Sequence, residues 1–482
     1  MAHKRKRRSS GMTVLLSAVT LLLSLTFCFA ACSFIDKLTG PKDPSSGPEI
    51  SLSDPVEQEK EHESDVPGTT AKPDETTQPT QSDELGQVVS SATISSQGDL
   101  LIHKPIIDCS YKGGAYDFEA VFRYLKPYTD GYDYAVANLE TTFGGVEFPY
   151  QGFPQFNCPD AFAGDVAEAG FDMLLTANNH AADTLAGGIT RTVEQVRSQG
   201  ITTLGTYLND SEKKYEVVEI NGIKVGMVCF TYGYSHDGTK FSLNGLAPID
   251  DVGAVNFFMN DNLDKLYTEA QQHMDGMKAE GADVTVFFIH WGVEYQIKEN
   301  STQNKIAQRL CDMGFDVIVG GHPHVVQPVE LIESTVDPEH KTVCIYSLGN
   351  AVSNQRTGIS SLFPDGYTED GVLFTVTFEK YENGEVYLAD ADVIPTWVNM
   401  HSNSGSKEYN ILPLEKSREG EWKSLFHMTE GQFSNAKRSY DRTMGIVGDG
   451  LADCQEYLAN QKAIREGQQP TMAYNSGYDN AA

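Results

Sequence analysis

Residues 284–294 read VTVFFIHWGVE and residues 315–324 read FDVIVGGHPH, two short hydrophobic runs that each break into histidine. Between them, the segment from Ser301 to Met313 has a helical pattern that Ser301 and Thr302 can cap. A strand, a helix and a second strand in this order predict a crossover unit with two parallel strands. We therefore expect an α/β domain.

The same pattern recurs along the chain, because six hydrophobic runs are followed by Asp, Glu, Asn or His. Open α/β sheets bind ligands at the carboxyl ends of their strands, where loops meet in one crevice. Six such endings favour one shared site over six unrelated surface residues. The runs and the polar residues after them are 92–96 with Asp99 and His103, 134–137 with Asn138 and Glu140, 171–177 with Asn179 and His180, 284–289 with His290 and Glu294, 315–319 with His322 and His324, and 343–346 with Asn350.

Two Asn-Gly pairs, Asn221-Gly222 and Asn383-Gly384, lie between alternating runs of hydrophobic and polar residues. Asn-Gly in this setting predicts a hairpin turn between antiparallel strands. Parallel and antiparallel strands are thus both expected. The predicted fold class is a layered α/β fold with central mixed sheets and an antiparallel C-terminal part.

Several of these polar residues also have a structural explanation. Asn179 can cap a turn, Glu140 can be a solvated carboxylate, and Asp99 can form an Asx turn. His322-Pro323-His324 is the stronger candidate, because proline fixes the backbone and residues i and i+2 of an extended segment project to one side. Imidazole together with carboxylate and amide oxygens suits one or two divalent metal ions such as Mn, Zn or Fe.

The N-terminus is expected to carry an export signal. A basic start, MAHKRKRR, is followed from Met12 to Ala31 by an apolar run that is nearly free of charge. Ala30-Ala31-Cys32 at its end resembles the bacterial lipobox, in which Cys32 would be acylated, although Phe29 stands where that motif usually has an aliphatic residue. A retained signal anchor is the alternative. Both interpretations place the protein at the cell membrane, on its extracytoplasmic face.

Composition divides the rest of the chain. Residues 33–90 are rich in Pro, Ser, Thr, Asp and Glu, which predicts a disordered tether. Residues 91–400 are expected to form the main domain, and residues 401–455 an extension that packs on it. Residues 456–482 are polar and predict a disordered tail.

The chain is strongly acidic, with 67 acidic and 36 basic residues and a net charge of −31. Such a charge argues against nucleic acid or anionic lipid as a partner, although solubility alone also explains it. Outside the export signal, no pair of cysteines has zinc-knuckle spacing. Cys229 and Cys344 lie in apolar runs and are expected to be buried thiols, whereas Cys109 and Cys158 are candidates for a disulfide.

Six motifs lie along the chain in this order: GDLLIH at 98–103, ANLE at 137–140, NNHAAD at 178–183, HWGVE at 290–294, GHPHVVQ at 321–327 and SLGN at 347–350. In order and spacing they resemble the CapA family of bacterial capsule or poly-γ-glutamate synthesis proteins, across about residues 93–398. The fold of that family is related to calcineurin-like metallophosphoesterases. The resemblance therefore implies a metallophosphoesterase-like fold.

The resemblance also implies a role for the motif residues. The metal ligands would be Asp99 and His324 for a first metal, Glu140 as the bridge, and Asn179, His290 and His322 for a second metal. Further candidates are His103, Asn138, Glu294 and Asn350.

His180 would donate a proton or a hydrogen bond to the leaving oxygen, and Asp183 would either orient His180 or cap the following helix. The chain departs from the phosphoesterase pattern at two places. Leu101 stands where the first motif, Asp-x-His, has histidine, and Asn138-Leu139-Glu140 replaces the usual Gly-Asp-x-x-Asp.

Three functions follow from these features. The first is an extracytoplasmic protein for the synthesis, export or anchoring of capsule, poly-γ-glutamate or another anionic surface polymer, with metal-dependent hydrolysis or transfer as its chemistry. The second is a non-catalytic accessory subunit of a membrane-bound polymer synthase. The third, a solute-binding lipoprotein, predicts two similar lobes, and the sequence contains no internal repeat. The expected partners are the polymer or its precursor, the synthase subunits, and the membrane through the N-terminal anchor.

Overall fold

A computed structural model describes residues 85–236, 239–246, 248–250, 254–403 and 405–468. The chain divides into two units, Met1–Thr76 and Thr77–Ala482, and all described residues belong to the second. The predicted export signal with Cys32, and the predicted tether as far as residue 84, lie outside the described residues. The last residues assigned to the tether, 88–90, are not disordered but begin the strand Val88–Leu100. Among the helices that the structure does describe, none has the length and hydropathy needed to span a bilayer.

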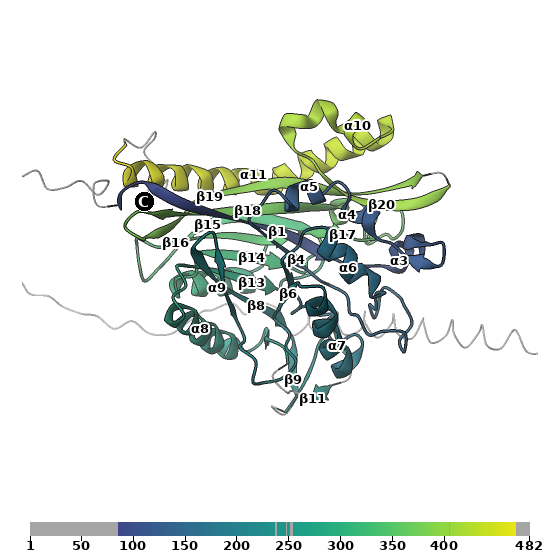
Figure 1. Ribbon diagram of the computed structural model, residues 1–482, viewed down its shortest axis with the longest axis horizontal. Helices are drawn as coiled ribbons and strands as arrows, with labels where there is room; N and C mark the ends of the chain where they lie inside the picture. Colours follow the sequence, from purple (N-terminus) through teal and green to yellow (C-terminus); the bar gives the residue numbers. More distant parts are fainter. Residues whose placement is uncertain (1–84, 237–238, 247, 251–253, 404, 469–482) are drawn as a thin grey trace, which may run out of the picture. The chain divides into compact units, whose positions relative to one another are not determined.

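The first of two large sheets is mixed and has eight strands (Figure 1). Its order is β20-β19-β18-β1-β4-β5-β6, with β17 paired to β1. The central strand β1 is parallel to β4 and antiparallel to β18. The strands are β1 (Val88–Leu100), β4 (Tyr134–Asn138), β5 (Met173–Leu175), β6 (Thr202–Leu204), β17 (Asn350–Val352), β18 (Asp370–Tyr381), β19 (Val386–Asn403) and β20 (Ser406–Pro413).

The second large sheet is also mixed and has seven strands, in the order β12-β8-β13-β14-β16-β15 with β7 paired to β8. The strands β8, β13, β14 and β16 are parallel. Its members are β7 (Glu216–Ile220), β8 (Ile223–Tyr232), β12 (Phe257–Phe258), β13 (Val284–His290), β14 (Val317–Gly321), β15 (Val326–Glu333) and β16 (Lys341–Leu348). Two small sheets contain β2 (Tyr111–Lys112) with β3 (Ala115–Tyr116), and β9 (Tyr234–His236), β10 (Lys240–Ser242) and β11 (Ile249–Asp250).

The main core lies between the two large sheets. It joins residues such as Ile94 and Val136 of the first sheet to Met227, Val286 and Val319 of the second. A second core covers the outer face of the first sheet with α3 (Lys104–Ser110), α4 (Glu119–Phe122) and α6 (Ala161–Glu168). A third covers the outer face of the second sheet with α8 (Asp264–Ala279) and α9 (Ser301–Asp312). The layered α/β fold with central mixed sheets, predicted from the sequence, is confirmed.

Both predicted hairpins are present. Asn221 and Gly222 have φ values of 52° and 80° between β7 and β8, and Asn383-Gly384 joins the antiparallel strands β18 and β19. The strands β18, β19 and β20 form the predicted antiparallel C-terminal part.

The long helix α11 (Glu430–Arg465) lies along one side of the two-sheet core, where it contacts β19 of the first sheet and β15 of the second (Figure 1). It begins in a capping box made by Thr429 and Gln432. The prediction of a disordered tail from residue 456 is therefore wrong for residues 456–465, because α11 continues through Arg465. The residues that α11 contributes to the main core, Val447, Leu451, Cys454 and Leu458, repeat at helical spacing past that boundary.

Two smaller expectations also need correction. The cap of α9 is Asn300, whose side chain accepts from the backbone N–H groups of Thr302 and Gln303, and not Ser301 with Thr302. Cys109 and Cys158 are both free thiols, so they do not form the candidate disulfide. Cys229 and Cys344 are buried thiols, as expected.

His273 on α8 gives the fold a pH dependence that is independent of any metal. Burial, followed by the charges of Lys265 and Lys214, lowers the pKa of His273 to about 4, whereas an unfolded histidine titrates near 6.5. Between these values only the unfolded chain binds the proton, so this contribution to stability is present above pH 6.5 and is lost as the pH falls toward 4. We expect urea midpoints at pH 7.5 and pH 5 to differ less in His273→Gln than in the parent. The exposed residue His236 provides the control substitution, and an unchanged pH dependence in His273→Gln would contradict the assignment.

Candidate metal centre

The predicted site residues lie where strands of both sheets end. Asp99 lies near the end of β1, opposite Asn138 at the end of β4. In the second sheet His290 is the last residue of β13 and pairs with Gly321, which immediately precedes His322. Because these strands are parallel, their carboxyl ends meet at one edge. The centre is thus formed by loops of both sheets.

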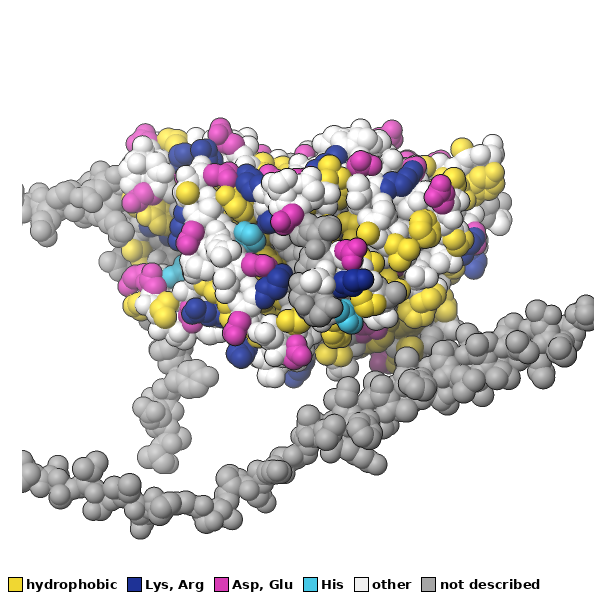
Figure 2. All heavy atoms as spheres, turned by 90° about the horizontal axis from the view of Figure 1, so that it is seen from below, with side chains coloured by type: hydrophobic (Ala, Val, Ile, Leu, Met, Phe, Trp, Pro, Cys, Tyr) yellow, Lys and Arg dark blue, Asp and Glu magenta, His cyan; other side chains and the backbone are white. Residues whose placement is uncertain are grey.

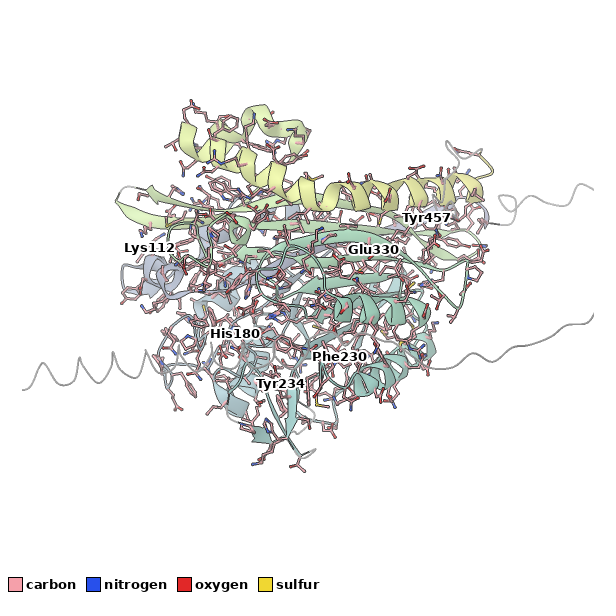
Figure 3. The ribbon with its side chains drawn as sticks, turned by 180° about the vertical axis from the view of Figure 1, so that it is seen from behind. Lys112, His180, Phe230, Tyr234, Glu330 and Tyr457 are labelled. Atoms are coloured by element: carbon pink, nitrogen blue, oxygen red, sulfur yellow. The ribbon has the colours of Figure 1, made fainter. Side chains whose placement is uncertain are left out.

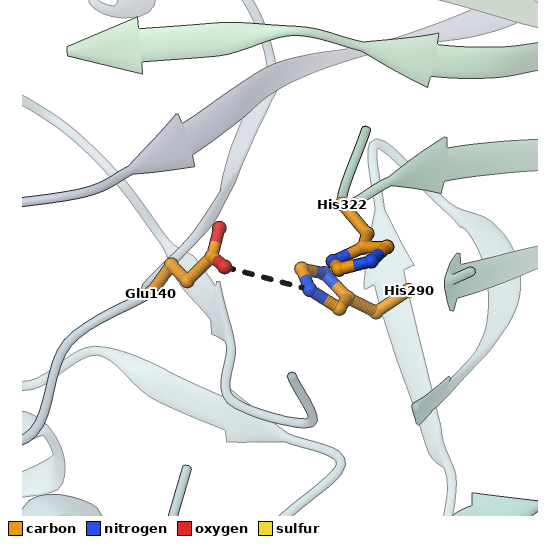
Figure 4. A group of neighbouring side chains, drawn as sticks. All are labelled: Glu140, His290 and His322. Carbon is orange, nitrogen blue, oxygen red and sulfur yellow. Dashed lines mark ion pairs between the residues drawn. The ribbon is translucent and has the colours of Figure 1, made fainter. Parts of the chain in front are cut away.

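Glu140, His290 and His322 form the first of two groups that could hold a metal ion (Figure 4). One ligand atom of each residue lies within 4.8 Å of the others. Glu140 Oε1 is 3.6 Å from His290 Nε2. We call this group the Glu140–His290–His322 triad.

Asp99, Glu140 and His324 form the second group, with the same 4.8 Å limit. His324 Nδ1 lies 3.2 Å from Asp99 Oδ2, and His324 Nε2 lies 3.9 Å from Glu140 Oε1. Glu140 is therefore common to both triads. This is the arrangement that the resemblance implied for a bridging ligand.

The triads fit a cation because they bury acceptors that have no donor. Asp99 and Glu140 are 0% exposed. Neither oxygen of Glu140, nor His322 Nδ1, has a hydrogen-bond partner among the described residues. Buried charges are normally paired or coordinate metals, since an unpaired one is costly. A divalent cation held by these residues would satisfy these atoms.

The pKa values of the side chains agree with this fit. Burial lowers the pKa of His290 to about 3, and burial with the charges of neighbouring histidines, His180 among them, lowers that of His322 well below its usual value. Both imidazoles are therefore neutral at pH 7, which is the form that binds a metal. Burial and the charges of Asp99 and Glu294 raise the pKa of Glu140 well above its usual value. A nearby cation would reverse that shift, because opposite charge favours the ionised carboxylate.

His324 differs from the other two histidines. Burial acts to lower its pKa, but the hydrogen bond and the charge of Asp99 outweigh burial and raise it. The pKa of Asp99 moves the other way: burial acts to raise it, and His324, His290 and Asn138 together hold it below its usual value. Asp99 and His324 thus stabilise each other's charge in the second triad.

The sequence had suggested an extended backbone for His322-Pro323-His324, but the structure shows a different conformation. His322 and His324 have φ values of 101° and 58°. Such values are rare for residues other than glycine and concentrate at functional sites. The two imidazole centroids lie 5.9 Å apart. The turn, and not an extended segment, brings both rings into the centre.

Asparagine side chains surround the triads. Asn138 Nδ2 donates to Asp99 Oδ1 at 2.7 Å, and Asn179 Oδ1 is 2.9 Å from His290 Nε2. Asn350 Oδ1 is 3.2 Å from His324 Nδ1. Asn179 is therefore placed next to the ligand atom of His290, while Asn138 and Asn350 orient Asp99 and His324. Partners of this kind fix the rotamers of metal ligands.

His180 and Asp183 form a buried pair next to the triads. His180 Nδ1 lies 2.7 Å from Asp183 Oδ2, which also accepts from the backbone N–H of Phe156 at 2.6 Å. The carboxylate accepts, so Nδ1 carries the proton and Nε2 is left to exchange one. The helix α7 (Leu185–Ser198) has no side-chain cap. Of the two roles considered for Asp183, the hydrogen bond to His180 fits orientation of that residue.

Two other candidates lie outside both triads. His103 Nδ1 accepts from the backbone N–H of Asn354 at 3.2 Å, and burial lowers the pKa of His103 to about 4. Glu294 is half-buried and acts on Glu140 through its charge.

Comparison with known proteins decides the family. The family model of the bacterial capsule synthesis protein PGA_cap matches residues 93–355, more than half of the 482-residue chain. The chain belongs to the PGA_cap family. The CapA resemblance of the six motifs is thereby confirmed.

This PGA_cap protein is similar to two CapA proteins. The capsule biosynthesis protein CapA of Bacillus anthracis is 27% identical over 331 residues, which are 68% of this chain and 71% of that protein. The PGA biosynthesis protein CapA of Bacillus subtilis strain 168 is 28% identical over 274 residues, 55% of this chain and 65% of that protein. Among solved structures, the NAD nucleotidase NadN of Haemophilus influenzae matches with a TM-score of 0.39 and 14% identity, over 73% of this chain and 60% of that one.

Three residues of the PGA_cap site were not predicted from the sequence. Tyr232, the last residue of β8, places its ring 4.8 Å from that of His322 and 6.5 Å from that of His290. Like the candidate ligands, it lies at the end of a hydrophobic strand, but the sequence pattern considered only Asp, Glu, Asn and His at that place. Asn178 donates to the backbone oxygen of Leu139 at 2.7 Å, and its position beside Asn179 was the available signal. Asn244 Nδ2, 3.4 Å from His180 Nδ1, lies in a stretch without any motif.

Gly98 allows the PGA_cap protein to hold Asp99 in place. The backbone N–H of Asp99 donates to the carbonyl oxygen of Gly349 at 3.0 Å, and a methyl group on Gly98 would overlap that oxygen. Since the obstacle is backbone, we expect Gly98→Ala to destabilise the fold by about 3 kcal/mol, the upper end for overpacking, and to reduce bound metal. Gly187→Ala on α7 is the control, because its added methyl group meets no atom within 4 Å. Equal urea midpoints for the two variants would contradict the expectation.

Proposed function

We propose that this PGA_cap protein acts at the extracytoplasmic face of the cell membrane in making, exporting or anchoring an anionic surface polymer, as a metal-dependent hydrolase or transferase. The observation that carries the chemistry is that Glu140 belongs to both triads. The names of the relatives, a capsule biosynthesis protein and a PGA biosynthesis protein, support capsule or poly-γ-glutamate as the polymer.

One or two divalent ions are proposed as cofactors, with Mn, Zn or Fe as candidates, because the donors are imidazoles, carboxylates and an amide. Asp99, Glu140 and His324 would hold one, and Glu140, His290, His322 and Asn179 the other. A divalent ion supplies Lewis acidity, which polarises a phosphoryl or acyl oxygen of the substrate.

The remaining chemistry belongs to the chain itself. His180, with Nδ1 hydrogen-bonded to Asp183, presents Nε2 for proton transfer to the leaving oxygen. The triad side chains are nearly inaccessible to solvent, with His290 3% and His322 4% exposed, which strengthens electrostatic interactions inside the site.

A membrane anchor and the partners complete the proposal. Cys32 lipidation, or a retained signal anchor, would tether the chain, and a Cys32→Ala variant that still incorporates a labelled lipid precursor would exclude the lipoprotein form. On the face shown in Figure 2, acidic and basic side chains are interspersed, and the chain carries a net charge of −31. The net negative charge disfavours nucleic acid as a partner. We propose the polymer or its precursor and the synthase subunits as partners, with a bound metal ion making the contact to the anionic polymer.

A second function has one observation in its favour. Structural metal sites are closed, whereas catalytic ones keep an open position, and both triads are almost fully buried. This protein would then be a non-catalytic accessory subunit of a membrane-bound polymer synthase. In that case the metal would stabilise the fold or bind a ligand.

One experiment separates the two functions. The purified chain is analysed for metal and then assayed with Mn, Zn and Fe on small phosphoesters, cell-envelope glycopolymer phosphates and γ-linked glutamyl amides. Turnover that disappears on chelation and returns with the metal supports the enzyme. If a fully metallated chain turns over none of these classes, and His180→Asn still supports polymer production in cells, the accessory subunit replaces it.

A further inference from the structure

A pocket of about 420 Å³ lies at the opposite edge of the sheets from the metal centre. Asp316, which directly precedes β14, lines it, whereas His322 directly follows that strand. The two sites are therefore separated by about the length of a five-residue strand, roughly 16 Å. Tyr457, which also lines the pocket, is well separated from His180 in Figure 3. Other walls come from Lys341, Tyr387, Gln461 and Arg465.

Arg465, in the last turn of α11, is the unusual residue of this pocket. It is only 8% exposed, and among the residues that the structure describes its buried Nε and Nη2 atoms have no hydrogen-bond partner. Its guanidinium lies over the ring of Tyr387, 4.4 Å from the centroid. Lys462, one turn earlier on the same helix, is by contrast paired with Glu379 at 2.6 Å. A buried charge is expected to have a partner, and in this acidic chain Arg465 lacks one among the described residues.

The two unpaired nitrogens define the missing partner. Nε and Nη2 form one edge of the guanidinium plane, and this edge makes two parallel hydrogen bonds to a carboxylate or a phosphate. The tyrosine ring beneath the guanidinium holds it in place. The site thus requires a ligand with two coplanar oxygens.

The walls favour a carboxylate over a phosphate. Glu339 and Asp316 line the same pocket and would repel the two charges that phosphate concentrates on one group more strongly than the single charge of a carboxylate group. Leu388 and Ile464 add apolar surface, which suits the carbon skeleton of an organic acid. We propose that this pocket is a second ligand site, which binds a carboxylate-bearing molecule through Arg465. The proposal depends neither on the metal centre nor on the function assigned to it.

The test uses the purified chain and three sodium salts at equal ionic strength: glutarate, phosphate and chloride. A ligand that binds only the folded state raises the melting temperature by an amount that grows with the logarithm of one plus the ratio of its concentration to its Kd. We expect glutarate to raise the melting temperature above that in chloride. Arg465→Gln should weaken the apparent affinity for glutarate by roughly tenfold or more, as expected when one partner of a buried charge pair is removed. Arg438→Gln, at an exposed arginine of the same helix, should keep the parent response.

Gln461→Glu provides a test that keeps Arg465. Gln461 lines the pocket four residues before Arg465, so a glutamate there would supply an internal carboxylate in the favourable i,i+4 orientation. We expect this variant to melt higher than the parent in chloride and to lose the glutarate response. A parent that does not respond to glutarate, a folded Arg465→Gln or Gln461→Glu chain that responds as the parent does, or a larger response to phosphate than to glutarate would each overturn the proposal.

Discussion

Glu140→Gln is expected to remove metal from both triads at once. Glu140 is shared by the two groups, it is fully buried, and its two oxygens have no other partner among the described residues. Glutamine keeps the volume but not the charge. Since loss of an outer partner of a metal ligand already costs about 10- to 100-fold in affinity, loss of a shared ligand should cost more than about 100-fold. Metal content per chain, measured by mass spectrometry after dialysis, checks this.

The control for this change is Glu294→Gln, which removes the same charge from a half-buried residue outside both triads. That variant should keep its metal. The metal-free Glu140→Gln chain should unfold no more easily than the metal-free parent, so that loss of metal is not a consequence of unfolding. Equal metal content in Glu140→Gln and in the parent would contradict the prediction that Glu140 bridges two metal ions.

His180→Asn is expected to keep the metal but lose turnover. His180 is not a member of either triad, and its Nδ1 is fixed by Asp183 at 2.7 Å. General acid catalysis contributes about 10² to 10⁴ in rate, so its loss should appear in kcat with any substrate found for the enzyme. Asp183→Asn should also lower kcat, because an amide that donates to Nδ1 reverses the tautomer.

A purely structural His180 gives a different result. If the residue serves only to hold Asp183 and the loop around it, His180→Asn lowers the melting temperature while kcat of the folded fraction stays at the parent value. Measurement of kcat, melting temperature and metal content on the same preparation separates these outcomes. The exposed His236 on β9, changed to asparagine, is the matched control.

The strands and the triads could be predicted because both leave a pattern in the sequence. A buried strand reads as a hydrophobic run, and the residues after parallel strands meet at one edge wherever the strands lie in the sheet. Asp99, Glu140, His290, His322 and His324 were found in this way. Their roles as ligands, and that of His180 as a proton donor, stay predictions.

The features that the sequence did not reveal depend on tertiary contacts. Tyr232 reaches His322 only because β8 lies beside β13, and no local pattern indicates that pairing. The left-handed backbone of His322 and His324 is imposed by the surrounding structure, since isolated residues of this type avoid it. The start of the disordered tail was predicted too early, at residue 456, because polar residues on the outer face of α11 masked the apolar positions Cys454 and Leu458.

The position of β1 also sets the order in which the domain can assemble. The first strand of the domain lies between β4, which follows soon in the chain, and β18, which begins only at Asp370. Until Asp370–Tyr381 has been synthesised, one edge of β1 has no antiparallel partner, and an open edge of this kind invites pairing with other chains. Folding that depends on such distant pairings is slow. An emerging chain would therefore keep this edge open until its last quarter is being synthesised, a state that suits the export through a membrane proposed above.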